Sequence, residues 1–140
     1  MAPSAQIIDL AESRDETSLA TFLKAVADDL RLHILRVLSQ DSFSVTELCT
    51  IFAVRQSALS HHLKILSEAG LLSRKKEGTA TFYRRALPGG SLVTLQSQVL
   101  EHIDNEPVTP AVEVGVDRVQ AQREENSCLL YTSPSPRDRG

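Results

Sequence analysis

The sequence has little cysteine and no long apolar run. Its two cysteines, Cys49 and Cys128, stand far apart and lack the spacing of a metal-binding motif. This usage excludes a disulfide framework and predicts a reducing, cytoplasmic setting. No apolar run approaches the length of a membrane-spanning helix, and the N-terminus lacks the basic and hydrophobic regions of a secretory signal. We therefore expect one cytoplasmic domain with extensions that does not associate with a membrane.

Motifs that carry catalysis are also missing. No glycine-rich nucleotide loop follows a predicted strand, no nucleophile stands with a base, and no cluster of His, Cys, Asp or Glu has metal-ligand spacing. These absences predict a protein that is not an enzyme and that uses neither a cofactor nor a bound metal.

Positive charge is scarce overall but concentrated in one region. The 140 residues carry a formal net charge of −3. Residues 55–85 nevertheless hold seven basic and two acidic side chains, a local charge of +5. A local basic patch attracts phosphates whatever the total charge of the chain. The pattern favours a nucleic-acid contact, with a solvated charged hairpin as the alternative.

Residues 55–70, RQSALSHHLKILSEAG, show a two-sided helical pattern. Leu59, Leu63 and Leu66 recur at spacings of four and three, so they share one face of a helix. The opposite face is short and polar, and it comprises Ser57, Ser60, His61, Lys64 and Glu68. Compact hydrogen-bonding side chains suit a helix that enters the major groove of DNA. An ordinary amphipathic surface helix has the same periodicity and is the alternative.

A second, shorter helix is predicted just before this polar helix. Residues 46–53 carry a helical apolar stripe, with Ser44 as the N-cap and Glu47 completing a capping box. A tight turn through Val54 then joins the two helices, and Gly70 supplies the left-handed C-cap that ends the second. A short helix, a brief turn and a helix with a polar face predict a helix-turn-helix motif.

A basic β-hairpin is predicted directly after the polar helix. Residues 71–76 and 79–86 flank Glu77-Gly78, where glycine supplies the positive φ of a hairpin turn. Such a hairpin is typical of a wing, which places basic side chains along the phosphate backbone or at the minor groove. With helical stripes also present earlier in the chain, the predicted fold class is mainly α with a small β-hairpin (α+β), a winged helix-turn-helix.

Composition divides the chain into four segments. They are a flexible N-terminus (1–14), a winged helix-turn-helix DNA-binding and dimerisation domain (15–104), a linker and polar helix (105–126), and a disordered tail (127–140). The last helix of the domain, over 91–104, packs either on the first helix or on its equivalent in a second chain; both alternatives stay open. The Ser/Pro/Arg-rich tail resembles translated vector sequence and is expected to be non-native, the alternative being a native disordered tail.

Residues 23–86 resemble the winged-helix repressors of the ArsR/SmtB family. The matching stretches are FLKAVADDLRLHILRVL, SVTELCTIFAVRQSALSHHLKILSEAGLL and SRKKEGTATFYRR. The resemblance implies a homodimeric repressor that binds a two-fold symmetric operator in double-stranded DNA until an inducer releases it; the inducer is unknown. It also places the dimer interface on the first and last helices of the domain. The residues predicted there are Leu19, Phe22, Leu92, Leu95, Val99 and Ile103.

Candidate DNA contacts follow from the resemblance and from the charge pattern together. The resemblance places Gln56, Ser57, Ser60 and His61 at the positions that face the groove. His62 matches a histidine that is nearly invariable in the family, and we favour packing or a phosphate hydrogen bond over base reading for it. The complete set predicted to bind DNA is Arg55, Gln56, Ser57, Ser60, His61, His62, Lys64, Arg74, Lys75, Lys76, Arg84 and Arg85.

Metal sensing is not predicted, although relatives suggest two places for it. Thiolate-sensing members of the family carry three cysteines in the first helix of the motif, and only Cys49 matches that pattern here. A small buried hydrophobe is the preferred interpretation of Cys49. Other members bind zinc on the last helix, where this chain offers a single histidine, His102, with unsuitable spacing.

A second hypothesis concerns a longer protein. Residues 111–126 look like the helix that follows the winged domain in regulators with a methyltransferase-like C-terminal domain. The chain could then be the regulatory N-terminal fragment of a SAM-dependent methyltransferase fusion. The preferred hypothesis remains a dimeric, sequence-specific repressor.

Overall fold

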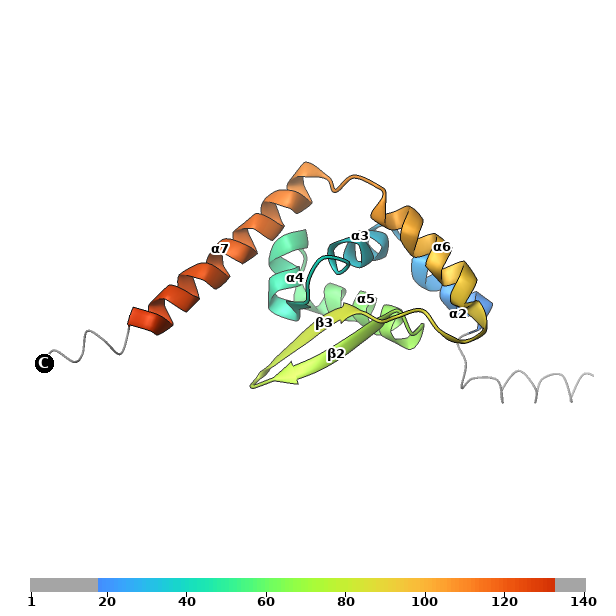
Figure 1. Cartoon of the computed structure of the whole chain (residues 1–140), viewed down its shortest axis with the longest axis horizontal. Helices are drawn as coiled ribbons and strands as arrows, with labels where there is room; N and C mark the ends of the chain where they lie inside the picture. The colour runs from blue at the N-terminus through green and yellow to red at the C-terminus, as the bar shows by residue number, and fades with distance from the viewer. Residues whose placement is uncertain (1–17, 133–140) are drawn as a thin grey trace, which may run out of the picture.

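The computed structural model describes residues 18–132 of the chain (Figure 1). The predicted flexible segment 1–14 and residues 133–140 of the predicted tail lie outside this range. The α-helices are α2 (Leu19–Val26), α3 (Asp29–Val37), α4 (Val45–Phe52), α5 (Gln56–Glu68), α6 (Val93–Asp104) and α7 (Pro110–Thr132). The strands are β1 (Phe43–Ser44), β2 (Leu72–Glu77) and β3 (Ala80–Arg85), and a short 3-10 helix, η2 (Gly90–Leu92), precedes α6.

Short polar side chains fix where the first helices begin. Ser18 accepts a hydrogen bond from the amide of Thr21 at the start of α2, and Asp28 accepts one from the amide of Arg31 at the start of α3. The predicted capping box of α4 is confirmed. The hydroxyl of Ser44 accepts from the Glu47 amide at 3.1 Å, and the Glu47 carboxylate accepts from the Ser44 amide at 3.0 Å. These bonds satisfy helix-end amides that would otherwise lack partners.

The turn between α4 and α5 is centred one residue earlier than the sequence predicts. Ala53 adopts a left-handed conformation with φ of 55° and ends α4. A left-handed alanine costs roughly 1 kcal/mol. Only residues 53–55 separate the two helices, and Leu48 of α4 packs in the same core as Leu59 and Leu63 of α5, which offsets this cost.

The wing is a three-stranded antiparallel sheet in the order β1-β3-β2. The predicted hairpin is confirmed, with Leu72 opposite Arg85 at its base and Glu77 opposite Ala80 at its tip. Gly78 has φ of 64° in the turn, as its predicted role requires. The third strand, β1, was not predicted, because a two-residue strand shows no periodicity. It pairs Phe43 with Tyr83 and so joins the start of α4 to the wing.

One hydrophobic core receives side chains from every helix and strand named above. Its largest fully buried members are Phe22, Phe43, Ile34, Leu35, Leu48, Leu59, Leu63, Leu66 and Val119. The leucines of the predicted apolar face of α5 are therefore confirmed as core residues. The winged helix-turn-helix is confirmed as the fold.

Helix α7 differs from the sequence boundaries. It begins at Pro110 and continues past residue 126 to Thr132, and neither glycine nor proline occurs between residues 126 and 132 to end it earlier. Figure 1 shows it crossing beside α4 and projecting beyond it. Among the described helices, none combines the length and the apolar character that crossing a bilayer requires.

Candidate nucleic-acid interface

The outer face of α5 is the first part of the candidate site. Gln56, Ser57, Ser60, His61 and Lys64 are all exposed. Because the three leucines on the opposite side are buried, the helix cannot rotate without exposing them to water. The core thereby holds these five polar side chains toward solvent in one direction.

Arg55 stands at the N-cap of α5 and is exposed. Its side chain makes no capping hydrogen bond. The first-turn amides of α5 are thus left without a side-chain acceptor, and the positive end of the helix dipole adds to the charge of Arg55. This end of α5 is suited to a phosphate group.

The wing supplies the second part of the site. Arg74, Lys75 and Lys76 on β2 are exposed, as is Arg84 on β3. Lys75 lies 3.6 Å from the carboxylate of Glu77, but both side chains are largely in solvent, so this pair is weak and leaves the lysine available.

A polar groove of about 700 Å³ joins the two parts. Ser60 and Lys64 of α5 line one side, and Ser73 and Arg74 of β2 line the other. Lys64 and Arg74 bring two cations to this surface, and Ser60, Ser67, Ser73 and Tyr83 bring hydroxyl groups. Glu68 also lines the groove and adds one carboxylate. The cations and hydroxyls are donors of the kind that hold a phosphate backbone. The sequence predicted Ser60, Lys64 and Arg74 as DNA contacts and missed the other hydroxyls, which carry no distinctive local signal.

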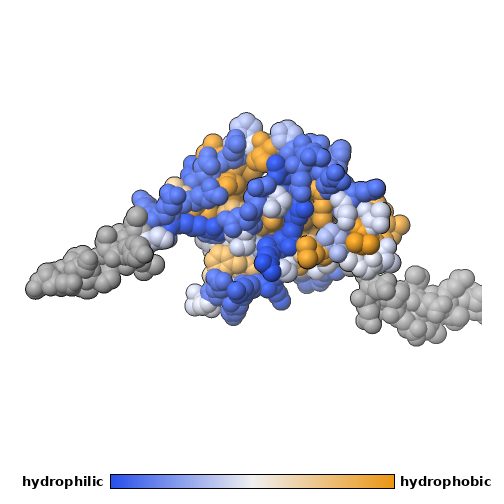
Figure 2. All heavy atoms as spheres, viewed as in Figure 1, coloured by the Kyte–Doolittle hydropathy of each residue, from blue (hydrophilic) through white to orange (hydrophobic). Residues whose placement is uncertain are grey.

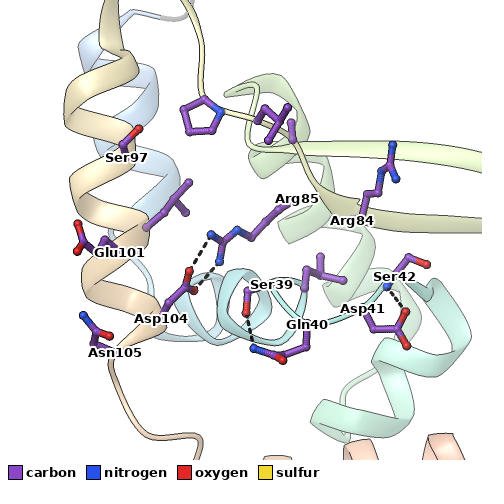
Figure 3. A pocket seen from close by; sticks show the side chains of 15 residues that line it. Ser39, Gln40, Asp41, Ser42, Arg84, Arg85, Ser97, Glu101, Asp104 and Asn105 are labelled. Carbon is purple, nitrogen blue, oxygen red and sulfur yellow. Dashed lines mark hydrogen bonds and ion pairs between the residues drawn. The ribbon is translucent and has the colours of Figure 1, made fainter.

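Arg85 was also predicted as a DNA contact, but its side chain is bonded within the protein. Its guanidinium donates two hydrogen bonds to the carboxylate of Asp104, at 2.6 and 3.0 Å (Figure 3). A third hydrogen bond goes to the carbonyl of Leu35 at 3.2 Å. Only 17% of its side chain is exposed. The pair lies in a pocket of about 730 Å³ between the end of α3, the base of the wing and α6. Arg85 therefore fastens the wing to α6, whereas its neighbour Arg84 is exposed.

His62 belongs to a cluster behind α5. Its Nδ1 lies 2.9 Å from a guanidinium nitrogen of Arg31 and 3.9 Å from the carboxylate of Asp28. Since a guanidinium only donates, Nδ1 accepts and the ring proton lies on Nε2. Burial lowers the pKa of His62, Asp28 raises it, and Arg31 and His61 lower it again, with a net downward shift. His62 is therefore a neutral acceptor that anchors α5, which agrees with the preferred packing role.

Arg31 was not predicted as a functional residue. Besides His62, it binds the carbonyls of Ala25 at 2.8 Å and Lys24 at 3.0 Å. One guanidinium thus joins the C-terminal end of α2 to the middle of α5. In the sequence, Arg31 occupies a polar helix position like any solvated arginine, so no local signal identifies it.

The predicted dimer residues fall into two groups. Phe22 and Ile103 are buried in the core of the protomer, so they are not free to contact a second chain. Leu19 is half exposed, and Leu92, Leu95 and Val99 are partly exposed. Two exposed residues that were not predicted, Leu23 and Val93, extend the same elements. Figure 2 shows hydrophobic groups over the region of α2 and α6.

No group of three His, Cys, Asp or Glu side chains within residues 18–132 is arranged to hold a metal ion. Cys49 is half-buried on α4, and burial raises the pKa of its thiol. A raised pKa keeps the sulfur protonated, which is the poorer state for a metal ligand.

The fold and the basic surface define a winged helix-turn-helix DNA-binding protein. A family model described as bacterial regulatory protein, arsR family, matches residues 28–74. HlyU of Vibrio cholerae has 33% identical residues and a TM-score of 0.51, and the match covers 62% of this chain and 91% of that one. The chain belongs to the ArsR family of transcriptional regulators, a family without enzymatic activity.

Two further relatives bear on function. The arsenical resistance operon repressor of Bacillus subtilis is 46% identical over 61 residues, which is 43% of this chain and 58% of that protein. A homodimeric winged helix-turn-helix DNA-binding domain of Mycobacterium bovis, from a possible ArsR-family regulator, is 26% identical with a TM-score of 0.52 and coverage of 78% and 91%. The chain spans between 58% and 65% of the length of the first curated relatives that it matches. Nothing in these comparisons supports a methyltransferase domain.

Proposed function

We propose that the protein is a dimeric repressor that binds a double-stranded DNA operator in the cytoplasm and is released by an inducer still to be identified. The observation that carries this proposal is the groove in which Ser60 and Lys64 of α5 face Arg74 of β2. A helix with a compact polar face beside a basic strand matches the shape and charge of a major groove flanked by phosphates. The name of the Bacillus subtilis relative supports repression as the output.

Within this proposal the two parts of the site have different tasks. Gln56, Ser57, Ser60 and His61 read base edges, because they are short and exposed on α5. The cations bind phosphates and supply most of the affinity; they are Arg55, Lys64, Arg74, Lys75, Lys76 and Arg84. Arg85 is left out because its donors are bonded inside the protein.

Dimerisation is proposed through the exposed apolar side chains of α2 and α6. Leu19 and Leu23 lie on α2, and Leu92, Leu95 and Val99 lie on η2 and α6. Exposed apolar side chains favour a self-complementary interface between two copies of the chain. The homodimeric Mycobacterium bovis domain supports dimerisation itself.

Binding to selected DNA at several salt concentrations tests the proposal. The full chain is first used to select duplexes from a randomised library, and affinity for the selected and for random duplexes is then measured by fluorescence anisotropy. Replacing Lys75 and Lys76 with alanine is expected to weaken both and to lower the salt slope by about 1.8, or roughly 0.9 for each phosphate that is no longer neutralised. Replacing Gln56 and Ser57 is expected to weaken the selected duplex far more than random DNA. Failure to select any sequence, or an unchanged salt slope, would contradict the proposal.

A further inference from the structure

Helix α7 packs against α4, the first helix of the helix-turn-helix, along a close contact at Gly115. A Cβ atom at this position would lie 2.6 Å from the carbonyl oxygen and 2.8 Å from the Cα of Ile51. Only glycine therefore lets the two helix backbones approach this closely. Val112 and Val119, one turn to either side, are also buried. The contact is a packed helix–helix interface.

Arg123 extends this face of α7 by one further turn and makes four hydrogen bonds. Its Nε and one terminal nitrogen donate to the two carboxylate oxygens of Glu47, at 2.8 and 2.7 Å. The same terminal nitrogen donates to the carbonyl of Ser42 at 2.8 Å, and the other donates to the carboxylate of Asp41 at 2.9 Å. Its guanidinium carbon lies 4.9 Å from the ring centroid of Phe43. All these contacts fall within residues 41–47.

The carboxylate of Glu47 is stabilised in its ionised form by its hydrogen bonds, although it is partly buried. Burial raises the pKa of Glu47, but hydrogen bonds from Arg123 and Ser44 lower the same pKa by more, so the net shift is downward. Glu47 therefore stays ionised and serves two partners, the guanidinium of Arg123 and the N-cap amide of α4. Removing Arg123 would leave a half-buried carboxylate with only part of its partners.

Residues 41–47 connect the two DNA-contacting parts. Phe43 pairs with Tyr83 of β3 and so sets the edge of the wing. Ser44 and Glu47 set the start of α4, which packs on α5. A change in this segment therefore alters the angle between α5 and the wing. Within residues 18–132, the hydrogen bonds of the Arg123 guanidinium reach neither α5 nor the exposed face of the hairpin.

We propose that Arg123 is a positioning residue for DNA recognition, which holds residues 41–47 so that α5 and the wing meet one duplex in the correct relative orientation. The inference rests on the proposed function. Base reading needs this orientation to within a fraction of an ångström, whereas phosphate contacts by flexible cations tolerate its loss. Loss of Arg123 thus lowers the preference for the selected sequence rather than all DNA binding.

Two variants of α7 form a matched pair. Arg123→Gln removes the guanidinium cluster. Arg118→Gln makes the same change of charge on the same helix, and Arg118 is exposed and makes no hydrogen bond or ion pair in the described part of the chain. Both variants of the 140-residue chain are compared with the wild type on the selected duplex and on random DNA, at a temperature where circular dichroism shows all three folded.

Arg123→Gln is expected to lose about tenfold in affinity for the selected duplex, a size typical of coupled networks, and less than about twofold for random DNA. Arg118→Gln is expected to match the wild type on both. Amide hydrogen exchange over residues 43–52 is expected to rise in Arg123→Gln alone. If Arg123→Gln folds poorly, Asp41→Asn serves instead, because it removes only one of the ion pairs of Arg123. It should lower the ratio of affinities for the selected and random duplexes by a smaller factor.

Two results would overturn the role of Arg123. One is an equal loss of affinity for the selected duplex and for random DNA, because a purely structural residue lowers the active fraction for all DNA alike. The other is an unchanged ratio of the two affinities together with unchanged amide hydrogen exchange over residues 43–52. A wild-type protein that does not distinguish the selected duplex from random DNA would instead reject the proposed function, and this inference with it. The wild-type measurement therefore separates the two failures.

Discussion

Two adjacent arginines at the base of the wing should respond to mutation in opposite ways. Arg85 is bonded to Asp104 and to the carbonyl of Leu35, and only 17% of its side chain is exposed. Arg84 is exposed and forms no hydrogen bond or ion pair with residues 18–132. Methionine at either position keeps the unbranched stem and removes the charge. The same substitution therefore separates internal anchoring from DNA contact.

The geometry sets the size of the expected effect. Arg85→Met removes two charge-assisted hydrogen bonds and one bond to a carbonyl, and it leaves Asp104 without its partner. Bonds to charged groups contribute about 1.5–3 kcal/mol each when buried. Because Asp104 is 35% exposed, solvent takes up part of the loss. We expect a loss of about 2 kcal/mol in the free energy of unfolding, against less than about 0.5 kcal/mol for Arg84→Met.

Urea unfolding at one fixed protein concentration measures the first effect, and the salt dependence of DNA binding measures the second. Arg85→Met should unfold at lower urea with an unchanged salt slope. Arg84→Met should unfold like the wild type, with the salt slope lowered by about 0.9. Asp104→Asn provides a double-mutant cycle, and we expect a coupling of about 1 kcal/mol with Arg85. A lowered salt slope for Arg85→Met with unchanged stability would refute the conclusion that Arg85 anchors the wing and does not contact DNA.

Three further predictions concern other anchors of the DNA-binding elements. The pKa of His62 is lowered in the folded state, so the unfolded chain binds more protons at mildly acidic pH. The free energy of unfolding should therefore fall as pH drops below about 6.5. His62→Gln should reduce this pH dependence in urea titrations between pH 7.5 and 5.5. Arg31→Lys should cost about 1–2 kcal/mol, since one ammonium cannot span three separate acceptors, whereas exposed Arg74→Lys should stay within about 0.5 kcal/mol in thermal unfolding. Ser44→Ala should cost about 1 kcal/mol by removing half of the capping box; a loss no larger than that of the exposed Ser57→Ala would contradict this.

Features encoded by neighbouring residues were predictable. The apolar face of α5 follows from the spacing of its leucines, and Ser44 with Glu47 specifies a helix start through a local hydrogen-bond pattern. The hairpin follows from Gly78 between two β-prone runs. In each case the decisive contacts join residues within a few positions, so periodicity and turn chemistry are sufficient.

Features decided by distant partners were not predictable. Arg85 and Arg84 are identical in type and adjacent, and only the location of Asp104 on another helix distinguishes them. Arg123 lies in a polar stretch whose docking on α4 depends on Gly115, a residue that sequence rules associate with turns rather than helix contacts. Phe22 and Ile103 fit an apolar stripe, but a stripe alone does not say which of its members face the protomer core.

The basic residues fall into two groups, arginines bonded inside the protein and cations exposed on its surface. Arg31, Arg85 and Arg123 each join a segment of the DNA-binding unit to a helix outside it: α5 to α2, the wing to α6, and the start of α4 to α7. A planar guanidinium suits this task because it reaches several acceptors at once. The exposed cations, which include lysines, need only offer charge to phosphates. Counting basic residues therefore overstates the proposed DNA-binding surface, because Arg31, Arg85 and Arg123 make their hydrogen bonds inside the protein.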